Sequence, residues 1–166
     1  MQVISRRTVL SAPLCAAWIS RLAAGDTREP APRFWAKTLD GERYTNDSIK
    51  GKVVLLQFWT TWCPNCRRDE PAVESLHEEF KDKGLVILSV DVGEAKKKVM
   101  KYLAESPRSC KMVLMDDTNL AAMFSAKAFP VYVLIDRDGN IAARQNGAGG
   151  EYTLRRLLAK AGLEGE

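Results

Sequence analysis

The 166-residue chain is poor in the features that mark several common classes of binding protein. It has one histidine, and beyond residue 25 its 22 Lys and Arg residues face 21 Asp and Glu residues, so the body is almost neutral. A body without a basic surplus provides no electrostatic footprint for nucleic acid. After the first 25 residues, no apolar run approaches the roughly 20 residues that a membrane-spanning helix needs. The length suits one domain with an appendage. We expect the protein to be a monomer and to have no nucleic-acid partner.

Cysteine is also scarce, and its number is informative. Of the four cysteines, Cys15 lies in the first segment, which leaves Cys63, Cys66 and Cys110 in the body. Three cysteines cannot close into a framework of structural disulfides, so one thiol is left over. We interpret Cys110 as a buried core thiol; a regulatory or intermolecular role is the alternative.

The first 25 residues have the pattern of an export signal. Arg6 and Arg7 precede an apolar run over residues 8–20, and small residues follow it. A basic start, a short apolar stretch and small residues at its end are typical of a leader for secretion, and the arginine pair resembles a twin-arginine signal. We therefore predict an exported, periplasmic or extracytoplasmic protein, in which disulfides can form. Retention of the leader as a membrane anchor is the alternative.

A linker at residues 26–32 leads to a domain at residues 33–163, in which strand and helix patterns alternate. Expected strands cover residues 33–38, 42–45, 53–59, 85–90, 111–115, 131–135 and 141–145. Expected helices cover residues 63–81, 94–105, 118–126 and 152–161. Strands alternating with helices, followed by a hairpin and a final helix, predict an α/β domain with a central mixed sheet flanked by helices.

Two cysteines stand where a buried strand ends and a helix begins. Cys63 and Cys66 are three residues apart, and side chains at this spacing on a helix are neighbours at about 5–6 Å, which suits a disulfide. Free N–H groups and the helix dipole favour negative charge at a helix N-terminus, and this lowers the pKa of a thiol. We expect Cys63 to be the nucleophile and Cys66, one turn deeper, to be the resolving thiol.

The phase of the same helix selects one carboxylate. Asp69 shares a face with Cys66 and with the apolar positions Val73, Leu76 and Phe80, so it should point inward. Burial favours the neutral form of a carboxyl group, which allows proton exchange near neutral pH. We hypothesise that Asp69 takes the proton from Cys66 when that thiol attacks. Stabilisation of the helix by interaction with its dipole is the alternative role.

Taken together, these residues resemble a known family. The motif at residues 58–68 contains Trp62-Cys63-Pro64-Asn65-Cys66, Pro71 follows in the helix, and Phe129-Pro130 precedes a later strand. Over about residues 30–160 the chain is similar to the exported TlpA/ResA-like branch of the thioredoxin superfamily. The resemblance implies a thioredoxin fold with an N-terminal β-hairpin extension. It also implies an insertion at about residues 93–125, which lies before the strand that follows a cis-proline.

The resemblance also implies how substrate is bound. Pro130 would be cis and would face the cysteine pair, although the base rate for X-Pro bonds favours trans. The backbone of Phe129 would then pair with an extended substrate in the manner of an added strand. Trp62, Pro64 and Asn65, which border the cysteines, complete the expected substrate-binding residues.

The activity implied is thiol–disulfide exchange outside the cytoplasm. Family members typically reduce protein disulfides, for example those of apocytochrome c or respiratory assembly targets, and a membrane electron-transfer protein recharges them. No cofactor is implied beyond the Cys63–Cys66 disulfide itself.

The chain departs from the pattern at three places. Asp69 replaces the usual Glu, Gln57 replaces the buried Asp of cytoplasmic thioredoxins, and Pro64-Asn65 is not the dipeptide of the best-known reductants. Because the residues between the cysteines help to set the redox potential, a thiol oxidase or isomerase of exported proteins remains an alternative.

Two other interpretations stay open. Thr60 and Cys63 have the spacing of a peroxidase motif, but position 56 is Leu where that motif has proline. The two thiols with Cys110 and His77 could also form a zinc or copper site on the same fold. His77, however, lies eleven residues beyond Cys66, about 16 Å along a helix, so we predict no metal site.

Overall fold

The computed structural model describes residues 28–165. The predicted export signal and the first two residues of the predicted linker lie outside these residues. Within residues 28–165 no helix combines the length and the apolar character required to cross a bilayer.

The domain is built on a mixed seven-stranded sheet. In chain order the strands are β1 (Trp35–Thr38), β2 (Arg43–Thr45), β3 (Val53–Trp59), β4 (Leu85–Asp91), β5 (Lys111–Thr118), β6 (Val131–Ile135) and β7 (Ile141–Asn146). Their order across the sheet is β2-β1-β5-β4-β3-β6-β7. The β3·β4 and β4·β5 pairs are parallel, and the other pairs are antiparallel. The prediction of a mixed α/β sheet is confirmed.

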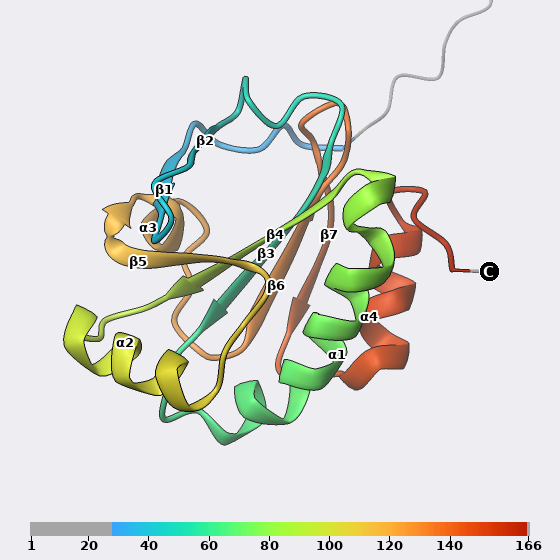
Figure 1. Cartoon of the computed structure of the whole chain (residues 1–166). Helices are drawn as coiled ribbons and strands as arrows, with labels where there is room; N and C mark the ends of the chain where they lie inside the picture. The colour runs from blue at the N-terminus through green and yellow to red at the C-terminus, as the bar shows by residue number, and fades with distance from the viewer. Residues whose placement is uncertain (1–27, 166) are drawn as a thin grey trace, which may run out of the picture.

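Helices cover both faces of this sheet (Figure 1). They are α1 (Pro64–Phe80), extended by the 3₁₀ turn η1 (Lys81–Lys83), and α2 (Lys96–Glu105), α3 (Leu120–Met123) and α4 (Gly150–Ala159). α1 and α4 lie side by side on one face, where residues of α2 join the same apolar cluster. α3 and the segment before β1 pack on the opposite face. This arrangement places the N-terminus of α1 at the end of the central strand β3.

The central strand explains why its sequence is almost continuously apolar. Every residue of β3 is buried, because the strand lies between β4 and β6 and is covered on both faces. A strand in such a place has no polar side. Gln57 is the one polar residue in the run, and its side chain joins a buried hydrogen-bond network described below.

The predicted extension and insertion meet at one edge of the sheet. The hairpin of β1 and β2 turns at Asp40-Gly41, where Gly41 has a φ of +91° that favours glycine. β1 then pairs antiparallel with β5, which belongs to the insertion. An unpaired edge strand leaves backbone N–H and C=O groups without partners. The pairing of β1 with β5 therefore lets the hairpin and the insertion satisfy each other's backbone groups.

Several predicted boundaries were wrong. The strand expected at 111–115 continues to Thr118, because β1 pairs with it at Val113 and, after an irregularity in the register, at Thr118, beyond the two aspartates. The helix expected at 118–126 is only one turn, and Ser125 just beyond it has a left-handed φ of 49°. The last helix occupies Gly150–Ala159 rather than 152–161.

Candidate active site

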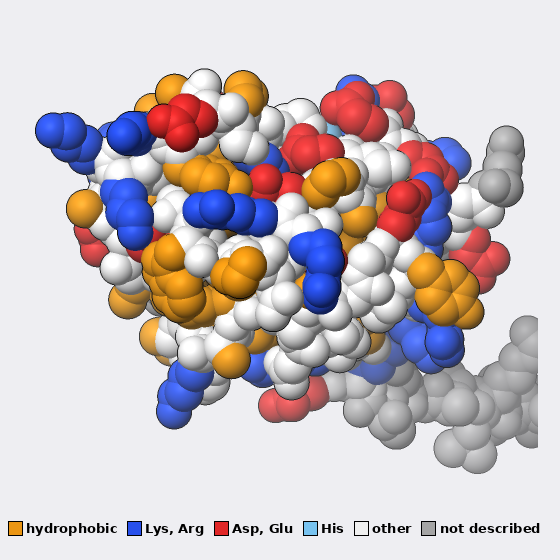
Figure 2. Space-filling view, turned by 90° about the horizontal axis from the view of Figure 1, so that it is seen from below, with side chains coloured by type: hydrophobic (Ala, Val, Ile, Leu, Met, Phe, Trp, Pro, Cys, Tyr) orange, Lys and Arg blue, Asp and Glu red, His pale blue; other side chains and the backbone are white. Residues whose placement is uncertain are grey.

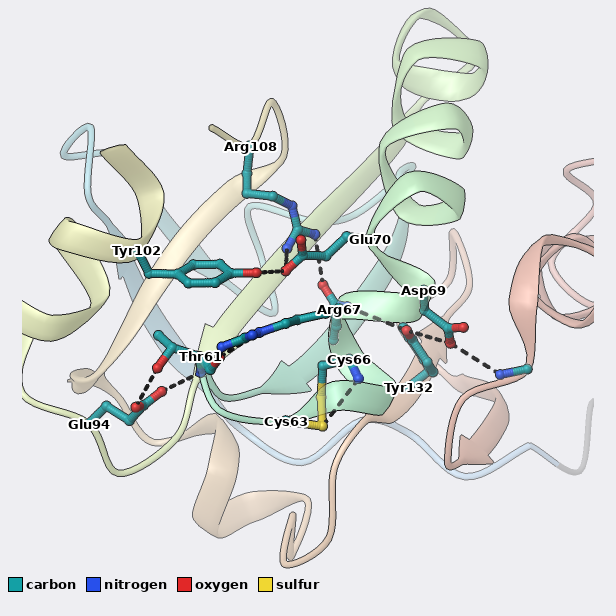
Figure 3. Close-up of a disulfide and its surroundings, with 12 residues drawn as sticks. Thr61, Cys63, Cys66, Arg67, Asp69, Glu70, Glu94, Tyr102, Arg108 and Tyr132 are labelled. Carbon is teal, nitrogen blue, oxygen red and sulfur yellow. Dashed lines mark hydrogen bonds and ion pairs between the residues drawn. A yellow bond between two sulfur atoms is a disulfide. The ribbon is translucent and has the colours of Figure 1, made fainter. Parts of the chain in front are cut away.

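The two motif cysteines are joined in a disulfide at the end of β3. Cys63 and Cys66 have a Cα separation of 5.3 Å, within the range that disulfides adopt. Cys66 is fully buried, whereas Cys63 is 4% exposed. Figure 3 shows the pair at the start of α1, with Thr61 and Glu94 on one side of it and Asp69 and Tyr132 on the other.

Cys63 caps α1 rather than forming its first residue, so the predicted start of the helix was one residue early. Its backbone is extended (φ −80°, ψ 108°), and its Sγ accepts a hydrogen bond from the backbone N–H of Cys66 at 3.2 Å. Pro64 occupies the first helical position, where its missing N–H costs no hydrogen bond. An N-cap acceptor is usually the oxygen of Ser, Thr, Asp or Asn. Here a sulfur takes that place, where the helix dipole and a backbone amide favour negative charge.

The loop before Cys63 is held by charged side chains on two sides. Glu94, between β4 and α2, accepts hydrogen bonds from the backbone N–H of Thr61 (2.5 Å) and from its hydroxyl (2.8 Å). Arg67 of α1 donates from Nε to the Thr61 carbonyl at 2.9 Å and lies over the ring of Tyr102. Sequence reasoning missed this pair of anchors, because nothing in the sequence pairs the loop with residue 94.

An apolar surface surrounds the disulfide. Trp62 is 59% exposed, and its ring meets that of Phe129 edge to face with centroids 6.4 Å apart. Pro64 and Asn65 are exposed beside it, whereas Pro130 is buried and follows a cis bond, as the resemblance implied. Figure 2 views this end of the molecule and shows hydrophobic side chains gathered with Lys and Arg side chains between them.

Asp69 points inward, as the helix phase predicted, and is fully buried. Its Oδ2 accepts from the Tyr132 hydroxyl and from the Gly149 N–H, and its Oδ1 accepts from the Gly150 N–H, each at 3.1 Å (Figure 3). Three converging donors suit a carboxylate, which only accepts. Both glycines are required: Gly150 has a φ of +65°, and a Cβ at Gly149 would lie 2.6 Å from a carbon of Thr153.

Comparison with known proteins identifies the family of this fold and site. The model of the Redoxin family matches residues 23–158. The chain belongs to the Redoxin family. Thioredoxin-like protein YneN of Bacillus subtilis (strain 168) is 36% identical to it over 115 residues, which are 68% of this chain and 67% of that protein.

Other similarities place this Redoxin-family chain in the TlpA/ResA-like branch of the thioredoxin superfamily. Thiol-disulfide oxidoreductase ResA of Bacillus cereus is 28% identical over 130 residues, 78% of this chain and 75% of that protein. The structure is also similar to the crystal structure of a thioredoxin-family thiol:disulfide interchange protein from Chlorobium tepidum TLS. The TM-score is 0.71 and the sequence identity is 24%, and the match covers 81% of this chain and 96% of that chain. At that identity the structural likeness establishes the fold alone. With its Cys63–Cys66 pair, the chain is a thiol–disulfide oxidoreductase of the ResA type.

A buried polar network lies behind the site and was not predicted from the sequence. Gln57 contacts the hydroxyl of Tyr132 (3.4 Å) and the guanidinium of Arg108 (3.3 Å). Arg108 has a side chain only 1% exposed and pairs with Glu74 at 2.7 Å and with Glu70 at 3.3 Å. Glu70 of α1 thus joins a partly buried cluster. Through Tyr132 this network extends to Asp69 (Figure 3).

The remaining thiol is free and buried. Cys110 is 4% exposed, and its sulfur lies 3.8 Å from Arg108 and 3.9 Å from the sulfur of Met112. Burial raises the pKa of this thiol to about 11, against the opposing charge of Arg108. Both features agree with the interpretation of a core thiol. Within residues 28–165, His, Cys, Asp and Glu form no group of three that could hold a metal ion.

Proposed function

We propose that this oxidoreductase works outside the cytoplasm and reduces disulfides of other exported proteins, with Cys63 as the nucleophile and Cys66 as the resolving thiol. One observation carries the proposal. The Sγ of Cys63 occupies the N-cap of α1, accepts the Cys66 amide and is bonded to the buried sulfur of Cys66. A sulfur in this place is favoured as a thiolate, the form that attacks disulfides.

The first step begins from the reduced pair. The Cys63 thiolate attacks one sulfur of the client disulfide, forms a mixed disulfide and releases the other client sulfur as a thiolate. In the second step the sulfur of Cys63 is the one attacked, and the client sulfur is the leaving group.

In the second step Cys66 resolves the mixed disulfide. Its thiol loses a proton to Asp69, and its sulfur attacks Cys63, which restores the disulfide and releases the client with two thiols. Asp69 suits this task because it lies one turn beyond Cys66 on the buried face of α1. Gln57 of β3 stands where cytoplasmic thioredoxins have a buried Asp, and its amide cannot take a proton. Asp69 is the acid nearest to the resolving thiol along α1.

The client would dock against the exposed surface around Cys63. Trp62 provides apolar area, Phe129 packs against it, and Pro64 and Asn65 border the sulfur. An extended client segment would lie along the backbone at Phe129, ahead of the cis bond to Pro130, and pair with it as an added strand.

Each turnover consumes two electrons, which a second protein must return. We propose a membrane electron-transfer protein as this partner, and apocytochrome c or respiratory assembly proteins as clients. The support is the predicted export signal, because a protein outside the cytoplasm has no access to the reductants that keep cytosolic thiols reduced. The disulfide pair is the only redox group that the cycle uses.

Single cysteine variants test the cycle. Cys63→Ser should abolish disulfide exchange, whereas Cys66→Ser should accumulate a mixed disulfide between Cys63 and a client peptide, detected by mass spectrometry without reductant. Sustained turnover by either variant would refute the two-cysteine mechanism. The direction is tested by the reduction potential: a value near that of thioredoxin, about −270 mV, supports a reductant, and one near −120 mV would reveal an oxidant.

A further inference from the structure

A second carboxylate lies buried beside the site, on the other side of it from Asp69. Asp91 ends β4, directly opposite Trp59 of β3. It is fully buried, and neither of its carboxylate oxygens has a hydrogen bond of good geometry within residues 28–165; the backbone N–H of Glu94 lies near enough to oppose the rise of its pKa but does not offset it. A buried charge without a partner is strongly destabilising, so this group needs either a proton or a donor.

The neighbouring ionisable group is another acid. In addition to burial, Glu94, whose side chain is 3% exposed, raises the pKa of Asp91 by hydrogen bonding and by its charge. Two carboxylates in contact cannot both be ionised without strong repulsion, and such pairs share one proton. A proton on Asp91, donated to Glu94, would satisfy both groups.

Glu94 is the group that keeps the charge. Its oxygens accept from the N–H and hydroxyl of Thr61, and Lys98 of α2 approaches at 2.5 Å. Burial opposes ionisation of Glu94, but Lys98, Thr61 and Asp91 together lower its pKa to about 2. Burial and the charge of Glu94 raise the pKa of Asp91 to about 7.

The cations of the neighbouring elements are already engaged. Arg67 of α1 binds the Thr61 carbonyl, and Arg108, which precedes β5, pairs with Glu70 and Glu74. Lys98 is the cation that acts on the pair, and it contacts Glu94. β3 contributes the uncharged Trp59 opposite Asp91. No cation therefore compensates Asp91 directly within the described residues.

We propose that Asp91 is a positioning residue for the redox site: it holds a proton against Glu94 and thereby keeps Glu94 on the backbone of Thr61, two residues before Cys63. This role deepens the proposed function and depends on it for its consequence in catalysis. When Asp91 loses the proton, two negative charges face each other in a buried place. Glu94 is then pushed from Thr61, and the loop that carries Cys63 loses its anchor on that side.

The sign of the pH effect follows. Below its raised pKa Asp91 is neutral and the anchor is intact; above that pKa Asp91 is charged and the anchor weakens. Asp91→Asn should mimic the protonated form at every pH, since the amide is isosteric, neutral and able to donate to Glu94.

Nuclear magnetic resonance of the oxidised full chain tests the proton directly. The side-chain carboxyl carbon of Asp91 should titrate near pH 7, and the Thr61 amide should shift with the same midpoint. In Asp91→Asn the Thr61 amide should not shift, whereas in Asp82→Asn, an exposed control with the same charge change, it should shift as in the wild type. A Thr61 step that persists in Asp91→Asn, or a carboxyl that titrates at an ordinary Asp value, would overturn the proposal. The carboxyl signal needs no variant, so a misfolded Asp91→Asn leaves the test standing.

A kinetic readout separates this proposal from the proposed function. The rate of client disulfide reduction by Asp91→Asn, divided by that of wild type, should be close to one at pH 6 and rise several-fold at pH 8. A ratio that stays constant across this range would refute the positioning role. The wild type could reduce no disulfide at any pH while the chemical shift of its Thr61 amide still changes with pH. The proposed function would then be refuted, and the claim that Asp91 holds a proton would be supported.

Discussion

Replacement of Asp69 by Asn tests the proton transfer that the cycle requires. The carboxylate now accepts three hydrogen bonds, from Tyr132, Gly149 and Gly150. An amide has one accepting oxygen and one donating nitrogen. The oxygen can still accept from Gly150, and the Tyr132 hydroxyl can turn to accept from the new nitrogen. The N–H of Gly149 cannot turn, so one buried donor loses its partner at a cost of about 1–3 kcal/mol in unfolding free energy.

The kinetic effect should exceed what this loss of stability explains. General base catalysis contributes about 10²–10⁴-fold, which corresponds to about 3–5 kcal/mol of activation free energy. In Asp69→Asn the decay of the mixed disulfide should slow by that factor, because Cys66 must lose its proton to solvent. Formation of the mixed disulfide should change by less than about tenfold, because Cys63 attacks as a thiolate that its own N-cap favours.

Quenched single-turnover reactions followed by mass spectrometry resolve the two steps, and urea unfolding measures the stability. Tyr132→Phe is the matched control: it removes one donor but keeps the carboxylate, so it should cost about 0.5–1.5 kcal/mol and leave resolution nearly unchanged. Equal slowing of both steps in Asp69→Asn would refute the base role. Equal slowing of resolution in Asp69→Asn and Tyr132→Phe would assign the effect to packing.

Two further predictions concern residues that sequence reasoning did not assign to the chemistry. Arg108→Met should lower the unfolding free energy by about 3–5 kcal/mol, because it leaves two partly buried glutamates without their cation. The control Arg155→Met, which removes a more exposed ion pair, should lower it by less than about 1 kcal/mol. Similar losses for the two variants in urea unfolding would contradict the burial argument. Cys110 should resist iodoacetamide at pH 8 in the folded, reduced protein and react on unfolding, because its pKa of about 11 keeps it protonated; alkylation of Cys110 as fast as that of Cys63 would show that the thiol is accessible.

The sequence predicted the framework of the site because local patterns carry it. The almost continuously apolar run of β3 indicates a central strand, and the pair Cys63 and Cys66 closely follows it. The inward direction of Asp69 follows from the helical period through Leu76 and Phe80, which are buried as expected. These inferences needed only neighbours within one strand or one helix.

The partners of these residues could not be predicted, because they are distant in the chain. Tyr132 and Gly149 are 63 and 80 residues from Asp69, and they meet it only because β6 and α4 pack around α1. Arg108 follows a helix end and has no periodic pattern that would mark it as buried. The strand predicted to end at Val90 continues one residue further, which is why the burial of Asp91 escaped notice.

The central claim is that the sulfurs of Cys63 and Cys66 interconvert between a disulfide and two thiols, with Cys63 first to react. Equilibration of the mature protein with graded ratios of reduced to oxidised dithiothreitol, followed by acid quench, alkylation and mass spectrometry, measures this most directly. We expect one two-electron transition in which these two residues gain or lose the alkyl label together, while Cys110 keeps a constant state. A disulfide that no ratio opens, or a transition that survives in Cys63→Ser, would contradict the account.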